Sequence, residues 1–109
     1  MSPLPDNKDL PFGLPVTVIE RLRKVFAANN KVEEVRVYGS RAKGTYRPGS
    51  DIDLTMFGNA LKWGDLQATE LLIDELDLPY KVDLSLYALI DNSDLREHID
   101  KVGKVFYSR

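Results

Sequence analysis

The sequence contains no cysteine, which excludes disulfide bonds, thiolate nucleophiles and zinc sites built on sulfur. Its single histidine, His98, leaves oxygen as the main ligand for any bound metal, so Mg²⁺, Mn²⁺ or Ca²⁺ is favoured over zinc. No apolar run approaches the roughly 20 residues that a membrane-spanning helix needs. The first residues lack the basic start and apolar centre of a signal peptide, so we expect a cytoplasmic protein with no membrane partner.

The charge is nearly balanced, because 15 lysines and arginines oppose 17 aspartates and glutamates, for a formal net charge of −2. A chain with this balance has no overall attraction for nucleic acid, and we expect no tight nucleic-acid binding. The length of 109 residues is typical of one domain with a single core. Four of the six prolines fall early in the chain, which predicts an irregular arm over residues 1–15 before a single domain over residues 16–109.

Hydrophobic periodicity predicts helices and strands along this domain. In chain order they are a helix over residues 15–28, a strand over 34–38, a strand over 51–57, a helix over 63–76, a strand over 80–87, a helix over 93–102 and a short strand over 105–107. Ser93 or Asp94 is the expected N-cap of the last helix, and Gly103 is its expected end. The helix at 63–76 is long enough to connect two parallel strands, whereas the short connection at 39–50 favours an antiparallel pair.

Three aspartates carry the most informative pattern. Asp51 and Asp53 alternate with apolar residues along one predicted strand, so their side chains project from the same face. Asp83 satisfies the same test on the next strand, which is expected to lie parallel to the first and to bring Asp83 to the same cations. Three carboxylates without sulfur and with almost no nitrogen suit hard divalent ions, which also bind phosphate oxygens.

A glycine-rich loop precedes the first two aspartates. Residues 39–50 are expected to form a loop with one helical turn beginning at Ser40. Gly39 allows the backbone to approach a ligand closely, and Ser40 offers amide and hydroxyl donors to an anion. Four basic residues and no acidic residue lie between positions 36 and 48, and we interpret them as an anion-binding lip: Arg36, Arg41, Lys43 and Arg47. A lip of this kind opposite a metal-binding floor is what a nucleoside triphosphate with Mg²⁺ requires.

Other interpretations of these residues are weaker. A P-loop would need a lysine after Gly44, where the sequence has Thr45. A hydrolase triad would have to use His98, which is more simply a surface or half-buried histidine. The basic loop lacks interleaved aromatic residues and is a poor nucleic-acid footprint. The remaining alternative is that the Gly-Ser pair marks a turn and that the aspartates lie on a solvated strand face, although aspartate is unfavourable in strands.

The run VYGSRAKGTYRPGSDIDLTMFG over residues 37–58 resembles the signature of the nucleotidyltransferase superfamily of DNA polymerase β. It is most similar to the minimal nucleotidyltransferases, which are small prokaryotic proteins consisting of little more than the catalytic domain. The order of predicted elements over residues 16–107 also follows that family. The resemblance therefore implies an α/β chain, more closely an α+β mixed sheet flanked by helices, with a polymerase-β-like core.

The resemblance also implies a reaction and its residues. It implies transfer of a nucleoside monophosphate, AMP from ATP being expected, with two Mg²⁺ ions for which Mn²⁺ can substitute. Asp51 and Asp53 would bridge both ions, and Asp83 would bind the ion that activates the acceptor hydroxyl. Ser40 and the amides around Gly39 would hold the outer phosphates. Of the basic residues in the loop, Arg41 and Lys43 are the expected nucleotide contacts.

The size of the chain bears on its partners, because little sequence remains outside the catalytic core to bind an acceptor. Minimal nucleotidyltransferases commonly act beside a small all-helical protein of the HEPN or substrate-binding type, sometimes as the antitoxin of a toxin–antitoxin pair. The resemblance therefore implies a hetero-oligomer, with a homodimer as the other assembly. Two alternatives are a binding module that neutralises its partner by contact, and nucleotidylation of a small molecule such as an aminoglycoside, whose enzymes carry a further helical domain.

Overall fold

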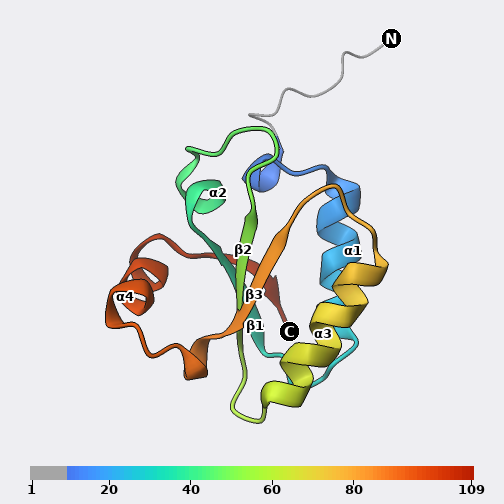
Figure 1. The fold of residues 1–109 in the computed structure, drawn as a ribbon, viewed down its shortest axis with the longest axis vertical. Helices are drawn as coiled ribbons and strands as arrows, with labels where there is room; N and C mark the ends of the chain where they lie inside the picture. Colours follow the sequence, from blue (N-terminus) through green and yellow to red (C-terminus); the bar gives the residue numbers. More distant parts are fainter. Residues whose placement is uncertain (1–9) are drawn as a thin grey trace.

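The computed structural model describes residues 10–109, which form a four-stranded sheet in the order β3–β2–β1–β4 with helices on both faces (Figure 1). The strands are β1 Glu34–Tyr38, β2 Ile52–Phe57, β3 Val82–Leu86 and β4 Lys104–Ser108. β1 pairs antiparallel with both β2 and β4, whereas β2 pairs parallel with β3. The mixed sheet and the direction of both predicted pairings are therefore confirmed.

The helices lie where the periodicity predicts them. They are α1 Val16–Ala27, α2 Ser40–Lys43, α3 Trp63–Glu75 and α4 Ser93–Val102, with short 3₁₀ turns η2 Pro11–Gly13 and η3 Tyr87–Leu89. The N-cap of α4 is Asn92, whose side-chain oxygen accepts hydrogen bonds from the amides of Asp94 and Leu95. The predicted caps, Ser93 and Asp94, were one and two residues late, because asparagine caps a helix as well as serine or aspartate does. No helix in this part of the chain is long and apolar enough to cross a membrane.

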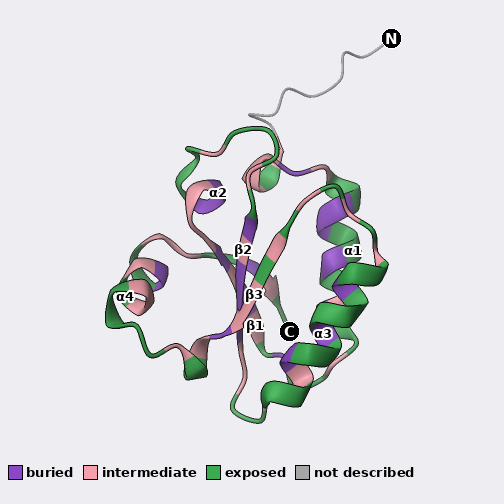
Figure 2. Ribbon diagram, viewed as in Figure 1, coloured by how far each residue is buried: buried purple, intermediate pink, exposed green. Residues whose placement is uncertain are grey.

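The core lies between the sheet and the helices α1 and α3, which Figure 1 shows side by side on one face. Alternate residues of β1 and β2 enter this core, including Val35, Val37 and Leu54, all fully buried. They meet Leu22 and Phe26 of α1, which are also fully buried, and the purple segments of α1 and the strands in Figure 2 follow this layer. The other face of the sheet carries the polar residues, and α4 lies on that side.

Several apolar residues of α3 lie outside the core. The helix packs through Leu66, Thr69 and Ile73, which share one face. Leu72 is rotated by about 100° from Ile73 and is 42% exposed. Trp63, the first residue of the helix, is 62% exposed. A helix that is apolar on several sides does not reveal from its sequence which side is buried.

The segment before α1 is attached to the domain. The predicted arm over residues 1–15 lies partly outside the described residues, and its described part contains η2 and a fully buried Leu14. Phe12 has a positive φ of 57°, and its ring centroid lies 5.8 Å from that of Phe106 in β4. Residues 10–15 are therefore packed against the domain rather than separate from it.

Asp65 joins the start of α3 to the end of α1. Its carboxylate accepts hydrogen bonds from the backbone amide of Lys62 at 2.9 Å, from the side chain of Asn29 at 3.0 Å and from the ammonium of Lys31 at 3.2 Å. These contacts, the Lys62 amide first, lower the pKa of Asp65. The carboxylate thus caps α3 and fixes it against the loop that follows α1.

Replacing Asp65 with alanine is expected to lower the melting temperature at neutral pH, because the amide of Lys62 and the two side-chain donors lose their acceptor. The pKa of Asp65 is lowered by folding, so this stabilisation is complete above the unfolded value of about 3.9 and is lost as the pH falls through the folded value. Thermal unfolding followed by circular dichroism should therefore show a deficit at pH 7 that shrinks at about pH 2. Glu70→Ala, on the exposed side of the same helix, is the control; equal melting temperatures for the two variants at pH 7 would contradict this account.

Candidate active site

Three polar side chains form a row across the polar face of the sheet. Tyr38 at the end of β1 pairs with Asp53 of β2, and Asp53 pairs with Asp83 of β3. All three residues belong to the strand positions that alternate with buried core residues, so their side chains project away from α1 and α3. The parallel register between β2 and β3 therefore brings together two of the three predicted carboxylates, Asp53 and Asp83.

The environment of Asp53 is electrostatically unfavourable for its charge. Burial raises the pKa of Asp53, and the negative charges of Asp83 and Asp51 raise it further. His98 acts in the opposite direction and lowers this pKa. Two neighbouring carboxylates can share a cation, which relieves the repulsion between them.

Asp51 is placed differently from the prediction. The strand β2 begins at Ile52, so Asp51 lies just before it, and its side chain is exposed. Among residues 10–109, no group of three acidic or imidazole side chains is close enough to hold one ion as it stands. Asp83 is also exposed, and the ammonium of Lys81 lies 3.9 Å from its carboxylate. The structure thus contains a pair of adjacent carboxylates and a third within electrostatic range of them.

This donor set fits a hard divalent cation. The available ligands are carboxylate oxygens, which Mg²⁺ and Mn²⁺ prefer, and the chain has no cysteine thiolate to favour zinc. Asp53 and Asp83 lie in register on neighbouring strands, so they can bind the same ion from two directions. The exposed position of Asp51 leaves its side chain able to turn toward them. Mg²⁺ commonly keeps several waters and few protein ligands, which matches two or three carboxylates at an open surface.

Gly39 lies directly against the carboxylate row. Its φ of 71° and ψ of −152° belong to a region that is nearly restricted to glycine, and a Cβ placed on it would overlap the Oδ2 atom of Asp53. The backbone amide of Gly39 donates a hydrogen bond to Nε2 of His98 at 3.2 Å. Ser40 follows, half-buried, at the start of the predicted helical turn α2. The loop therefore brings Ser40 to the same end of the neighbouring strands β1 and β2 as Asp53.

The basic residues do not form the exposed lip that the sequence predicts. Arg41 is only 3% exposed, and its guanidinium donates to main-chain carbonyls rather than facing solvent. Arg36 lies on β1, where it pairs with Glu34 and stacks over the ring of Phe57. Lys43 and Arg47 remain exposed. Arg41 is thus removed from the set of expected nucleotide contacts, because its charge is buried under the loop.

Sequence reasoning missed two residues of this site, Tyr38 and His98. Burial raises the pKa of the Tyr38 phenol, and the charges of Asp53 and Asp83 raise it further, against a hydrogen bond with Ser85 that lowers it. His98 packs its ring edgewise against Tyr38, at 6.2 Å between centroids, while it accepts from Gly39. Strand alternation could have identified Tyr38, because it follows the core residues Val35 and Val37 and so lies on the opposite, polar face of the sheet. His98 lies on α4, and the sequence does not show where α4 packs on the sheet.

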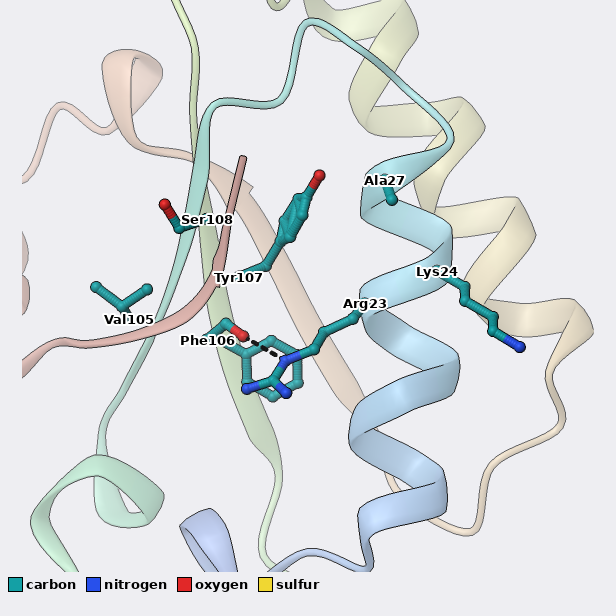
Figure 3. A pocket seen from close by; sticks show the side chains of 7 residues that line it. All are labelled: Arg23, Lys24, Ala27, Val105, Phe106, Tyr107 and Ser108. Atoms are coloured by element: carbon teal, nitrogen blue, oxygen red, sulfur yellow. Dashed lines mark hydrogen bonds between the residues drawn. The ribbon is translucent and has the colours of Figure 1, made fainter.

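A cavity of about 460 Å³ lies elsewhere, in the groove between α1 and the edge strand β4 (Figure 3). It is lined by Arg23, Lys24, Ala27, Val105, Phe106, Tyr107 and Ser108. None of these residues is acidic, and α1 lies on the opposite face of the sheet from Asp53. This groove is therefore unsuited to a cation, and the carboxylate row remains the candidate active site.

Comparison with known proteins gives a family and a fold. The family model described as "Polymerase beta, Nucleotidyltransferase" matches residues 20–109. No curated protein matches the chain at a significant level.

Three solved structures share the fold. A toxin–antitoxin complex with AMP-PNP has 22% identity and a TM-score of 0.64 over 88% of this chain and 75% of the other. The structure of a tri-AMPylated HEPN toxin from Shewanella oneidensis with its MNT antitoxin gives 18% identity, a TM-score of 0.63, and coverage of 86% and 72%. A protein from Sulfolobus solfataricus described as a nucleotidyltransferase gives 23% identity, a TM-score of 0.54, and coverage of 86% and 80%.

Replacing Gly39 with alanine is expected to destabilise the fold by about 1–3 kcal/mol, the range for a residue forced into this part of φ/ψ space. The new methyl group would also displace the carboxylate of Asp53, so Mg²⁺-dependent nucleotide binding should weaken. Urea unfolding and isothermal titration with Mg·AMP-PNP measure the two effects. Gly44→Asn is the control, because Gly44 has a φ of 80°, which asparagine tolerates, and open space around it. Equal stability and affinity in both variants would contradict the proposed contact.

Replacing Asp53 with asparagine is expected to raise the melting temperature at pH 7 in the presence of a chelator. Burial and the neighbouring carboxylates raise the pKa of Asp53, so its ionised form destabilises the fold. This penalty is absent below the unfolded value of about 3.9 and grows as the pH rises through the folded value. The gain in melting temperature should therefore disappear at about pH 3. Asp74→Asn, exposed on α3, is the control. A lower melting temperature for Asp53→Asn at pH 7 would show that the ionised carboxylate of Asp53 does not destabilise the fold.

Proposed function

Because the chain belongs to the polymerase beta nucleotidyltransferase family, and is thus a nucleotidyltransferase, we propose that it transfers AMP from ATP to a hydroxyl group of a small helical partner protein. The partner is proposed to be of the HEPN type, with this chain acting as the antitoxin of the pair in the cytoplasm. Within the family, this assignment corresponds to the minimal nucleotidyltransferases.

The observation that carries the proposal is the register that makes Asp53 and Asp83 neighbours, with Asp51 close enough to raise the pKa of Asp53. The loop that begins at Gly39 packs against the carboxylate of Asp53, so an anion held by the loop would meet a cation held by the strands. A triphosphate bound to Mg²⁺ contains both charges.

The proposed roles of the residues follow from this arrangement. When bound, two Mg²⁺ or Mn²⁺ ions held by Asp51, Asp53 and Asp83 would stabilise the attacking and leaving oxygens together. Ser40 would donate its hydroxyl to the outer phosphates, and the backbone around Gly39 would leave room for them. Lys43, exposed at the end of α2, would add positive charge near the departing pyrophosphate.

The proposed reaction forms one bond and breaks another. The oxygen of the acceptor hydroxyl attacks the α-phosphorus of ATP, and a new phosphorus–oxygen bond joins AMP to the acceptor. The bond from the α-phosphorus to the bridging oxygen breaks, and pyrophosphate leaves with the electron pair. The hydroxyl proton is released to water. Asp83 is proposed to act on the acceptor side, because it lies on the edge strand β3, away from the Gly39 loop.

The choice of acceptor is supported by two of the similar structures. One is described as a tri-AMPylated HEPN toxin with an MNT antitoxin, and another as a toxin–antitoxin complex with AMP-PNP. The polar face of the sheet is partly covered by α4 but leaves Asp83 exposed, so a partner can approach this carboxylate directly. A tyrosine or another hydroxyl on that partner is the proposed site of AMP attachment.

The proposal predicts a gain of mass in the partner. A HEPN-type helical protein that binds this chain, incubated with the chain, ATP and Mg²⁺, should gain one or more AMP units by intact-mass spectrometry. Asp51→Asn should abolish the gain, and Asp74→Asn on α3 should leave it unchanged. A partner that is bound and neutralised equally by Asp51→Asn, with no mass change in any sample, would favour the binding module instead.

Binding and chemistry should separate among the site variants. Asp83→Asn is expected to retain most of the affinity for Mg·AMP-PNP and to lose at least about a hundredfold in transfer rate, since its ion serves the acceptor. Ser40→Ala is expected to weaken triphosphate binding by about 1.5–3 kcal/mol, the range for a hydrogen bond to a charged group. Isothermal titration and release of pyrophosphate measure the two quantities. Transfer at the wild-type rate by Asp83→Asn would contradict its assignment.

A further inference from the structure

Arg41 is a buried cation, and its hydrogen-bond partners among the described residues are all uncharged. Its side chain is 3% exposed, and no carboxylate of residues 10–109 lies within ion-pair distance of it. Burial lowers the pKa of this guanidinium, whereas the rings of Tyr80 and Tyr46 and the charges of Asp51 and Asp53 raise it. A charge is kept in such a place only when its hydrogen bonds are satisfied, so its partners indicate what it does.

The guanidinium joins two segments that are distant in the sequence. Its Nε and Nη2 atoms donate to the carbonyl oxygen of Ser50, at 3.1 and 2.8 Å. Its Nη1 atom donates to the carbonyl oxygens of Phe12 and Gly13, at 2.9 and 3.4 Å. Arg41 therefore connects the 3₁₀ turn before α1 to the end of the Gly39–Ser50 loop.

Two tyrosine rings hold the guanidinium in this position. The ring centroids of Tyr46 and Tyr80 lie 5.3 and 5.2 Å from its central carbon. Tyr46 belongs to the same loop as Arg41, and Tyr80 precedes β3. A planar guanidinium stacks on aromatic rings while its edge donates hydrogen bonds, which the ammonium of a lysine cannot do in the same geometry.

The residues adjacent in sequence to these contacts are the proposed site residues. Ser40 precedes Arg41, and Asp51 follows Ser50. The amide of Ile52 donates to the carbonyl oxygen of Lys81, so the start of β2 is also fixed to the start of β3. A movement of the Ser50 carbonyl would carry Asp51 with it, because the two residues share a peptide bond.

We propose that Arg41 is a positioning residue, which fixes Asp51 relative to Ser40 by binding the Ser50 carbonyl against the turn Pro11–Gly13. Arg41 itself does not contact the nucleotide, because its donors are occupied by main-chain oxygens. The turn before α1 is then a support of the active site rather than an accessory arm. This inference deepens the proposed function and rests on it for its nucleotide readout.

Arg41→Lys and Arg41→Met test the proposal, with Arg23→Lys and Arg23→Met as matched controls. Arg23 also donates to a main-chain carbonyl, that of Phe106 at 2.8 Å, and its guanidinium lies 5.7 Å from the Phe106 ring, but it does so in the groove beside α1 (Figure 3). The measurements are hydrogen–deuterium exchange of residues 44–52, the Kd for Mg·AMP-PNP, and the melting temperature. All are made well below the melting temperature of each variant.

Both Arg41 variants should speed amide exchange over residues 44–52 and raise the Kd for Mg·AMP-PNP about tenfold, because the loop and Asp51 are no longer held. Lysine should not rescue either quantity, since it cannot make two bonds to the Ser50 carbonyl. The Arg23 variants should change neither. Folded Arg41 variants with lower melting temperatures but with wild-type exchange and Kd would overturn the proposal and leave Arg41 a purely structural residue.

Tyr80→Leu covers the case in which the Arg41 variants do not fold. It removes one stacking ring and leaves the hydrogen bonds, so a smaller change in the same direction is expected. Wild-type exchange and Kd in folded Tyr80→Leu would then overturn the proposal.

The failure of the proposed function can be distinguished from the failure of this inference. If the wild-type chain binds Mg·AMP-PNP but transfers no AMP, the proposed function fails, while the role of Arg41 can still be tested. If the wild-type chain binds no nucleotide, hydrogen–deuterium exchange over residues 44–52 alone tests whether Arg41 holds the loop.

Discussion

The parallel pairing of β2 with β3 places Asp53 beside Asp83, and two carboxylates in this arrangement repel when both are ionised. Strand alternation keeps the side chain of Asp53 out of the core, since its neighbours Ile52 and Leu54 already fill it. The pair therefore does not stabilise the fold. A cation bound between the two carboxylates would turn the repulsion into attraction, which gives the arrangement a chemical purpose.

The rest of the site keeps this pair in place from several directions. Gly39 can pack against Asp53 because glycine has no side chain. The backbone amide of Gly39 in turn donates a hydrogen bond to His98 of α4. Arg41 holds the other end of the same loop at Ser50. The hydrophobic core lies on the opposite face, between the sheet and the helices α1 and α3. The packing of this core offsets the destabilisation that the two carboxylates cause on the polar face.

The carboxylate pair was predictable because strand alternation fixes which residues share a face, and because a helical crossover makes the flanking strands parallel. The burial of Arg41 was not, since its partners are main-chain carbonyls that leave no pattern in the sequence. His98 is half-buried, as expected, but its hydrogen bond with the Gly39 amide was not predictable, because the packing of α4 on β1 is a tertiary property. Alternation predicts that Asp51 lies in the strand, but the pairing begins only at Ile52, because strand ends depend on partners that alternation does not show.

The central claim is that these carboxylates hold the metal ions of a bound triphosphate. A crystal structure of the chain with AMP-PNP and Mn²⁺, measured at the manganese absorption edge, tests it directly. The account predicts anomalous peaks at the carboxylates of Asp51, Asp53 and Asp83, with the triphosphate extending toward Ser40. Nucleotide bound elsewhere, for instance in the groove beside Arg23 and Tyr107, with no manganese at Asp53 and Asp83, would contradict it.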